Sequence, residues 1–522
     1  MAARMPFTLL SVLLLSSMTL PGSSLSNIDL WCRRTPNPEL CLYYMRHISK
    51  TFNVNRKPEF ATAAMVIALE QAIRLKNFAM QIGDMIQNEG EKAAWDDCYE
   101  LFDNTILRLK QTVSNYGMCT NSDIQTWLST ALTNVETCLA GYIEMGVSNG
   151  MLRHMSNTVS KLISNALVIN KVAPRVPWYN NVFPTWVPDH DQMLLLAPSP
   201  SPSPGGSGDS YLVVAQDGSG DFGTINEAIE AASKREWMGR FLIYVKEGNY
   251  NEYVQIDGNV KNITMVGDGI GKTIVTGNKH AGGNTTTFRT ATFAVTGDGF
   301  IARDITFRNT AGPSNGQAVA LRSGSDFSVF YKCSFEGYQD TLYVHSSRQF
   351  YRECNISGTV DFIFGNAVVI FQNCSIYVRR PLRSTNTITA QNRSDPHQNT
   401  GIVIHNSEVL ASEELNPVLT TVRTYLGRPW GNYSRTVVLK TYLGSLIDPA
   451  GWSKWDDNTN VNELYYGECN NSGPGSSTAK RVQWGGFHDI RSLSEASKFT
   501  VENFLDGDSW LPSTNLPYTS GL

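Results

Sequence analysis

The 522-residue sequence lacks a strong charge of either sign, since 43 Lys and Arg residues face 47 Asp and Glu residues and leave a net charge of −4. Nucleic-acid-binding surfaces usually need a basic excess, so no nucleic-acid partner is expected. Long apolar runs are also scarce. One from about Phe7 to Leu20 follows Arg4 and is too short to span a bilayer, so it predicts a secretory signal over residues 1–25. No later run predicts a membrane anchor, and we expect a secreted protein.

Signature motifs of the common hydrolase classes are missing as well. The sequence has no Gly-x-Ser-x-Gly turn, no His-Glu-x-x-His pair and no EF-hand loop, and these patterns usually mark serine, zinc and calcium sites. Its eight histidines are scattered along the chain. We therefore expect no metal ion and no cofactor, which leaves carboxylates and amides as the candidate reactive groups.

Cysteine is modestly represented, with nine residues, and in an exported chain these favour disulfides. The candidate pairs are Cys32 with Cys41, Cys98 with Cys138 between two helices, and Cys333 with Cys354 one repeat apart. No obvious partner exists for Cys119, Cys374 and Cys469. Seven Asn-x-Ser/Thr sequons suggest a glycoprotein, although which of them carry glycan stays open; they begin at Asn262, Asn284, Asn355, Asn373, Asn392, Asn432 and Asn470.

Helical periodicity dominates the region from residue 26 to residue 186. Four segments carry apolar residues at three- and four-residue spacing, which predicts an all-α four-helix bundle. These segments are 61–82, 92–114, 122–145 and 156–172. No catalytic or metal-binding pattern occurs in them, so the region is expected to be a binding or folding module.

A change of composition separates this region from the rest of the chain. Residues 187–210 include the sequence PSPSPSPGGSG and predict an extended, flexible linker. The second domain is expected over 211–522. Thr224 and Glu227 form a capping-box pattern that opens an amphipathic helix, and a helix at this point would cover the first coil of a repeat structure.

Polar residues recur in the second domain at a nearly constant interval. Gln317 and Gln339 are 22 positions apart, and Asp340 and Asp361 are 21 apart. Short β-branched and aromatic runs separated by Gly or Asn accompany this repeat, which predicts a mainly β fold, the right-handed parallel β-helix. Residues one coil apart in such a solenoid lie roughly 4.8 Å from each other. The two amides and two carboxylates should therefore converge on one face.

Two carboxylates on successive coils repel each other unless one is protonated or a cation lies beside them. Arg428, in the sequence LGRPW, is the candidate cation, and Trp430 offers a flat face on which a sugar ring can stack. Nucleophile, acid, amide donors, cation and aromatic ring together favour an enzyme site.

Five ordered blocks in the second domain resemble the signature segments of plant pectin methylesterases. They are 248-GNYNE, 317-QAVA, 339-QDTL, 361-DFIFG and 426-LGRPW. The helical region resembles, more loosely, the pectin methylesterase inhibitor domain. The resemblance implies a pectinesterase precursor of the plant cell wall that removes methyl esters from homogalacturonan, with an inhibitor-like pro-region that contacts this esterase or another one. A monomer is expected.

Roles follow from the resemblance position by position. It implies that Asp361 is the nucleophile, that Asp340 is the acid and then the base, and that Gln317 and Gln339 bind the oxyanion. Arg428 would hold Asp361 charged and bind substrate. The remaining substrate-binding positions implied are Thr287, Tyr343, Phe364, Trp430 and Trp452.

Three alternatives stay open. The chain could be a regulator that inhibits other esterases through its helical region, a non-catalytic polysaccharide-binding β-helix, or another pectin-acting β-helix such as a lyase or polygalacturonase. Precursors of the family commonly carry a basic pair before the catalytic domain, but residues 189–198 contain leucines and no Arg or Lys. Cleavage elsewhere in the linker and a full-length, self-inhibited form are therefore both open.

Overall fold

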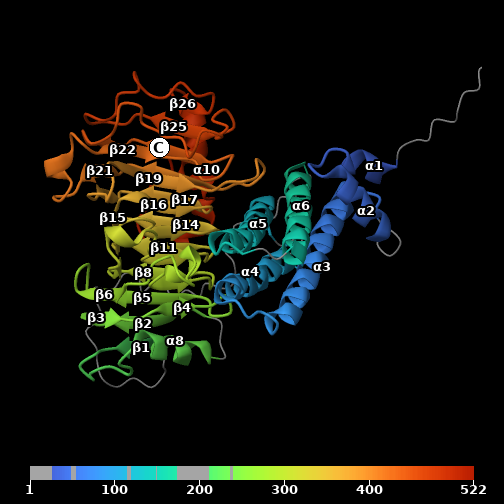
Figure 1. The fold of residues 1–522 in the computed structure, drawn as a ribbon, viewed down its shortest axis with the longest axis horizontal. Coiled ribbons are helices and arrows are strands. Elements are labelled where there is room, and N and C mark those ends of the chain that lie inside the picture. The colour runs from blue at the N-terminus through green and yellow to red at the C-terminus, as the bar shows by residue number, and fades with distance from the viewer. Residues whose placement is uncertain (1–25, 49–53, 115–118, 148–149, 173–210, 236–238) are drawn as a thin grey trace, which may run out of the picture.

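A computed structural model of the protein describes residues 26–48, 54–114, 119–147, 150–172, 211–235 and 239–522. An all-helical N-terminal region lies beside a long stack of strands (Figure 1). The predicted signal (1–25) and the predicted linker (187–210) lie outside the described residues. Among the helices that are described, none combines the length and the apolar character needed to cross a membrane.

The four long helices predicted from apolar periodicity are present, and two short helices precede them. Local signals agree with these elements, because Thr120 and Asp123 form a capping box at the start of α5. Two of the predicted disulfides, Cys32–Cys41 and Cys98–Cys138, are confirmed, and the second joins α4 to α5. The helices are α1 (Asn27–Cys32), α2 (Pro38–Ile48), α3 (Lys57–Gly83), α4 (Glu89–Ser114), α5 (Asn121–Glu144) and α6 (Gly150–Val172).

The second region is a parallel β-helix, as the repeat predicts. Its strands form three sheets of 11, 8 and 7 strands, and neighbouring strands within each sheet pair in parallel. The first sheet contains β1 (Tyr211–Val214), β2 (Phe241–Val245), β5 (Ile263–Gly267), β8 (Ile301–Arg303), β11 (Ser328–Tyr331), β14 (Arg348–Arg352), β17 (Val368–Gln372), β20 (Gly401–His405), β23 (Arg435–Leu439), β25 (Tyr465–Cys469) and β26 (Phe487–Asp489).

The other two sheets complete each coil. The 8-stranded sheet contains β3 (Gly248–Asn251), β6 (Thr273–Gly277), β9 (Thr306–Asn309), β12 (Ser334–Glu336), β15 (Asn355–Gly358), β18 (Ser375–Val378), β21 (Glu408–Ala411) and β24 (Tyr442–Leu443). The 7-stranded sheet, which positions the candidate site, contains β4 (Val254–Ile256), β7 (Phe293–Val295), β10 (Leu321–Ser323), β13 (Leu342–Val344), β16 (Val360–Gly365), β19 (Thr385–Gln391) and β22 (Arg423–Gly427).

Equivalent side chains stack along the inside of the coils. The rings of Phe330 and Tyr351 lie 4.7 Å apart, and those of Tyr351 and Phe371 lie 4.6 Å apart. All three are buried in the main hydrophobic core. Burial of these aromatic ladders on successive coils holds the 20- to 22-residue period, since a change of coil length would move apolar residues out of the core.

The predicted Cys333–Cys354 disulfide is wrong, because both residues are free, buried thiols, as is Cys374. Cys333 and Cys354 precede Ser334 and Asn355, which pair in register in β12 and β15. Side chains at equivalent positions of parallel strands point the same way rather than toward each other, which is unsuitable for a bridge. The Cys354 thiol instead donates to the backbone carbonyl oxygen of Phe330, 3.3 Å away.

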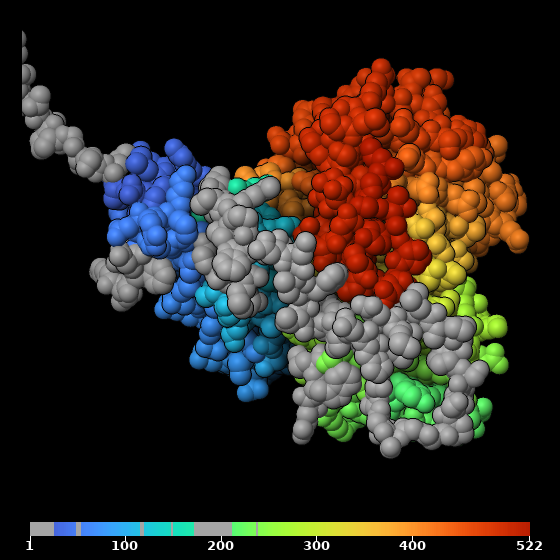
Figure 2. Space-filling view, turned by 180° about the vertical axis from the view of Figure 1, so that it is seen from behind, coloured from blue at the N-terminus to red at the C-terminus, as the bar shows by residue number. Residues whose placement is uncertain are grey.

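One end and one outer face of the β-helix are covered. The predicted helix after Thr224 is α8 (Ile225–Ser233), and its apolar side packs into the core beside β1 and β2 (Figure 1). At the other end of the chain, residues 496–516 pack against the outer side of the first sheet, and the red C-terminal segment in Figure 2 lies along this outside surface. These segments shield strands and apolar side chains that would otherwise face water.

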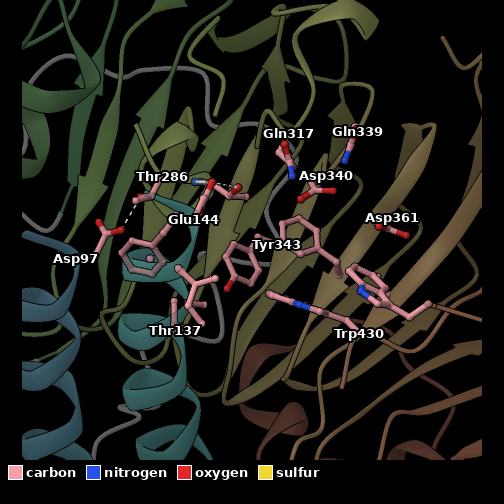
Figure 3. A pocket seen from close by; sticks show the side chains of 18 of the residues that line it. Asp97, Thr137, Glu144, Thr286, Gln317, Gln339, Asp340, Tyr343, Asp361 and Trp430 are labelled. Carbon is pink, nitrogen blue, oxygen red and sulfur yellow. Dashed lines mark hydrogen bonds between the residues drawn. The ribbon is translucent and has the colours of Figure 1, made fainter. Parts of the chain in front are cut away.

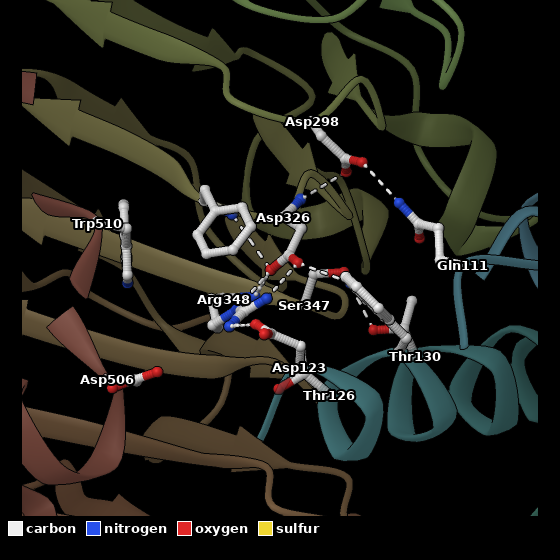
Figure 4. Close-up of polar contacts among 12 residues, drawn as sticks. Gln111, Asp123, Thr126, Thr130, Asp298, Asp326, Ser347, Arg348, Asp506 and Trp510 are labelled. Atoms are coloured by element: carbon white, nitrogen blue, oxygen red, sulfur yellow. Dashed lines mark hydrogen bonds and ion pairs between the residues drawn. The ribbon is translucent and has the colours of Figure 1, made fainter. Parts of the chain in front are cut away.

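Helices α4 and α5 lie against the β-helix, while α3 lies farther out (Figure 1). Helix α6 also touches the β-helix, where the Ser164 hydroxyl donates to Asp395. Buried charges hold this contact. Arg348 on β14 donates to Asp326 of the β-helix and to Asp123 at the start of α5, over 2.7 and 2.6 Å (Figure 4). Arg108 on α4 is fully buried and binds Asp298 at 2.7 Å. Buried pairs of this kind cost several kcal/mol to break when one partner is lost.

Candidate active site

The predicted reactive residues lie together on the 7-stranded sheet. Leu342 of β13 pairs with Ile363 of β16, so Asp340 and Asp361, each two positions earlier, occupy equivalent places on successive coils. Both have left-handed backbone conformations, with φ of 61° and 53°. Aspartate adopts this conformation more readily than most residues other than glycine, and other turns of the β-helix, such as that at Asp304, share it. The convergence expected from the repeat is therefore present.

Asp361 is held by a cation and a hydroxyl group. The guanidinium of Arg428 donates from Nε to Oδ1 at 2.8 Å and from Nη2 to Oδ2 at 2.5 Å. The hydroxyl of Thr387 on β19 donates to Oδ1 at 2.5 Å. These three hydrogen bonds fix the orientation of this carboxylate.

Asp340 is in a different environment, although it lies next to Asp361. Burial and the charge of Asp361 raise the pKa of Asp340 well above its usual range, Glu144 adds to the rise, and Arg428 opposes it. No cation contacts its carboxyl group directly among the described residues. The two aspartates therefore differ in their surroundings, since only Asp361 is bound by a cation while the pKa of Asp340 is raised. This difference suits one to attack and the other to donate a proton.

Amides and aromatic rings surround the two carboxyl groups in a pocket of about 420 Å³ (Figure 3). Gln317 and Gln339 lie along one side of it. Tyr343 and Phe364 stack at 4.3 Å, and the Trp430 ring lies 6.1 Å from Phe364. The predicted positions Thr287, Tyr343, Phe364 and Trp430 all line the pocket.

The prediction for Trp452 is wrong. Its side chain is only 1% exposed, stacks on Tyr466 at 4.3 Å and donates from its indole nitrogen to Glu468. Trp455, three residues later, lines the pocket instead, with its ring 4.3 Å from the Arg428 guanidinium. A short irregular segment carries both tryptophans, and the sequence has no periodic signal there that distinguishes the buried ring from the exposed one.

Residues of the helical region complete the pocket wall, and no motif or periodicity in the sequence predicts their contribution. Glu144, the last residue of α5, accepts hydrogen bonds from the backbone and hydroxyl groups of Thr287, at 2.8 and 2.7 Å. Asp97 of α4 accepts from the hydroxyl of Thr286 at 2.5 Å. Figure 3 shows Asp97 and Glu144 on the same side of the pocket as Thr286, facing the row from Gln317 to Asp361. These carboxylates are separated from their partners by more than 140 residues of chain.

The pocket continues into a second hollow that the helices do not cover. This hollow, of about 670 Å³, shares Gln339 and Arg428 with the first and is lined by residues between Pro313 and Ser453. The pair of hollows forms a groove that is occupied by helices at one end and open at the other, a shape suited to an extended polymer.

A parallel β-helix with a partly open groove, paired aspartates and aromatic rings along that groove is typical of a carbohydrate-active hydrolase. Comparison with known proteins gives the family. The family model described as pectinesterase matches residues 211–508, and the model described as plant invertase/pectin methylesterase inhibitor matches residues 26–169. The chain therefore belongs to the pectinesterase family, enzymes that remove methyl esters from pectin, and it carries an inhibitor-type region before the esterase.

Two curated relatives match this chain over nearly its full length. The chain is 54% identical over 522 residues to Pectinesterase 2 of Citrus sinensis, with 100% of both chains covered. It is 54% identical to the Probable pectinesterase/pectinesterase inhibitor 17 of Arabidopsis thaliana, covering 99% of this chain and 98% of that one. Among solved structures, a pectin methylesterase from carrot matches at 50% identity with a TM-score of 0.59, covering 62% of this chain and 100% of that one.

Proposed function

We propose that Asp361 and Asp340 carry out the demethylesterification of pectin. Asp361 attacks the C6 carbonyl carbon of a methylated galacturonate, and the amides of Gln317 and Gln339 donate to the oxygen that gains negative charge. Protonated Asp340 gives its proton to the departing methoxide, which leaves as methanol. The resulting acyl-enzyme anhydride is then hydrolysed by a water molecule that the ionised Asp340 activates.

The single observation that carries this proposal is the asymmetry between the two neighbouring carboxyl groups. Arg428 and Thr387 bind Asp361 directly, whereas Asp340 is buried beside that negative charge and its pKa is raised. An acid that stays protonated next to an ionised nucleophile is what the first step requires. A binding-only groove has no need of this arrangement, which supports the enzyme over the non-catalytic alternative.

Gln317→Ala should lower kcat for methanol release by about 10² to 10³-fold with a smaller change in KM, because an oxyanion donor acts mainly in the transition state. Steady-state assays of methanol release from methylated pectin measure both constants. Gln255→Ala is the matched control, since Gln255 lies on β4 of the same sheet but outside the pocket. Equal losses in kcat for the two variants would remove Gln317 from the proposed mechanism.

The helical region acts in this proposal as an intramolecular inhibitor of the esterase. The end of α5 lies at the pocket, where Glu144 engages Thr287, and this position supports competition between α5 and substrate. We propose the organisation expected from the sequence, with a secretory signal at 1–25, an inhibitor-like region at 26–186, a linker at 187–210 and the esterase at 211–522. The released product would act in the plant cell wall as a monomer on methyl-esterified homogalacturonan.

The contact between the two regions should weaken as the pH rises. Glu136 of α5 is half-buried against the β-helix, and both of its carboxylate oxygens accept from the Ser394 hydroxyl at 2.6 Å. Burial raises the pKa of Glu136 to about 7, and nearby Asp395 adds to the rise. A carboxyl group with a higher pKa in the contact than in water stabilises the contact at low pH, and this contribution is lost as the pH approaches 7.

Between pH 5 and pH 8 we expect the dissociation constant of the helical region to increase roughly 10²-fold. It can be measured by calorimetry on a chain cut within the linker. Glu136→Gln is neutral at every pH and should flatten the dependence, with the Ser394 hydroxyl still able to donate to its side-chain oxygen. A steep dependence that persists in this variant would assign the effect to other groups.

A further inference from the structure

Two arginines of the esterase lie together beside the pocket, at the end that the helices cover. Arg289 belongs to the short helix η1 (Thr287–Thr290), and Arg322 belongs to β10. The Arg322 guanidinium lies 3.4 Å from the centroid of the Phe288 ring and is 3% exposed, while Arg289 is 5.6 Å from the same centroid. Burial lowers the pKa of Arg322, and the charge of Arg289 lowers it further. Two partly buried cations this close require an anion.

The anions that compensate these arginines come from α4. Arg289 binds Asp97 at 2.6 Å and Glu100 at 2.7 Å, and Arg322 binds Glu100 at 3.4 Å. Within the described residues, each carboxylate in an ion pair with either arginine belongs to the helical region. The Nε of Arg322 is also buried without a hydrogen-bond partner. Removal of the helices therefore leaves a cationic pair beside the pocket without the carboxylates that compensate it.

The helical region presents carboxylates in a row along this part of the groove. Glu144 binds Thr287 and raises the pKa of Asp340, Asp97 binds Thr286 and Arg289, and Glu100 reaches Arg322. A demethylated stretch of the substrate polymer also presents a row of carboxylates, one on each sugar. The ion pairs made by α4 and α5 thus have the chemistry that the product of the reaction would offer.

We propose that Arg289 and Arg322, with Thr286, form a binding site for the free carboxylate of an already demethylated galacturonate, and that Asp97 and Glu100 occupy it in the intact chain. The inference rests on the proposed function, because it places product beside the reacting ester. It adds a preference for weakly methylated substrate, since an enzyme that binds its own product beside the active-site pocket removes esters from neighbouring sugars in succession. The helices then inhibit by imitating the product.

The test uses the intact chain with a protease site in place of residues 201–207, cut and separated at pH 8. The solved carrot chain is matched over its whole length but corresponds to only 62% of this chain. A relative of the esterase region therefore forms the fold without the helices. The probe is an unesterified galacturonate decamer added as an inhibitor of methanol release. Arg289→Gln should raise its inhibition constant about tenfold, because a charged hydrogen-bonding partner is lost. It should also lower kcat/KM on weakly methylated pectin more than it lowers kcat/KM on highly methylated pectin.

Two comparison variants separate substrate binding from the contact between regions. Arg289→Lys keeps the charge and should retain most of the affinity for the decamer. Asp298→Asn breaks the pair with Arg108 outside the pocket. Like Arg289→Gln, it should therefore activate the uncut chain. Unlike Arg289→Gln, it should leave the inhibition constant of the decamer for the cut enzyme unchanged. An unchanged inhibition constant in Arg289→Gln would show that the arginines serve only the contact with the helices. Failure of the proposed mechanism is detected separately, by an Asp361→Asn enzyme that still releases methanol.

Discussion

Asp361→Asn should lower methanol release from pectin by about 10⁴-fold or more, since loss of a nucleophile removes the step on which all later ones depend. The side chain keeps its shape, and asparagine tolerates the left-handed backbone at this position. What disappears is the negative charge that pairs with Arg428 and that attacks the ester in the proposed mechanism. Methanol release by the cut and separated enzyme measures the effect.

Asp304→Asn is the matched control for this variant. Asp304 has a φ of 58°, close to that of Asp361, and its carboxylate pairs with Arg303 outside the pocket. The same chemical change there should leave the rate near that of the wild type. Circular dichroism and the Tm of both variants report whether the β-helix is intact. Substantial turnover by a folded Asp361→Asn enzyme would falsify its role as nucleophile.

Separation of the helical region should raise the rate of methanol release about 10²-fold, because a tethered segment competes with substrate at an effective concentration in the millimolar range. Cutting the linker without separating the two regions should give a smaller increase in the rate of methanol release. The buried pairs Arg108–Asp298 and Arg348–Asp123 hold the helices after the chain is cut. Activity measured before cutting, after cutting and after gel filtration at pH 8 distinguishes these stages.

A chain in which the inserted protease site is scrambled is the control, and it should stay at the low initial rate. Asp298→Asn in the uncut chain offers a second route to release, since it leaves the fully buried Arg108 without its carboxylate. An uncut wild-type chain as active as the separated esterase would contradict the proposed inhibition. The position of α5 would then serve folding or export rather than control of the site.

Repetition made much of this protein predictable from its sequence. A parallel solenoid converts a spacing of about 21 residues into direct neighbours, so Asp340 and Asp361 could be placed together before any coordinates were known. Short-range signals were similarly reliable, as at Thr224, where the capping box depends on residues three positions apart. Apolar periodicity located the four long helices for the same reason.

Only the tertiary structure decided the features that have no period. The direction of stacked side chains excluded the Cys333–Cys354 bridge, and packing in an irregular segment buried Trp452 and left Trp455 at the pocket. The ends of α4 and α5 reach the groove through contacts between residues such as Glu144 and Thr287. Such contacts depend on how the surface of the helical region fits the surface of the β-helix, and the apolar periodicity of neither region predicts that fit. The sequence alone therefore determined which amides and carboxylates share one face of the β-helix, and the packing of one region on the other decided what occupies that face.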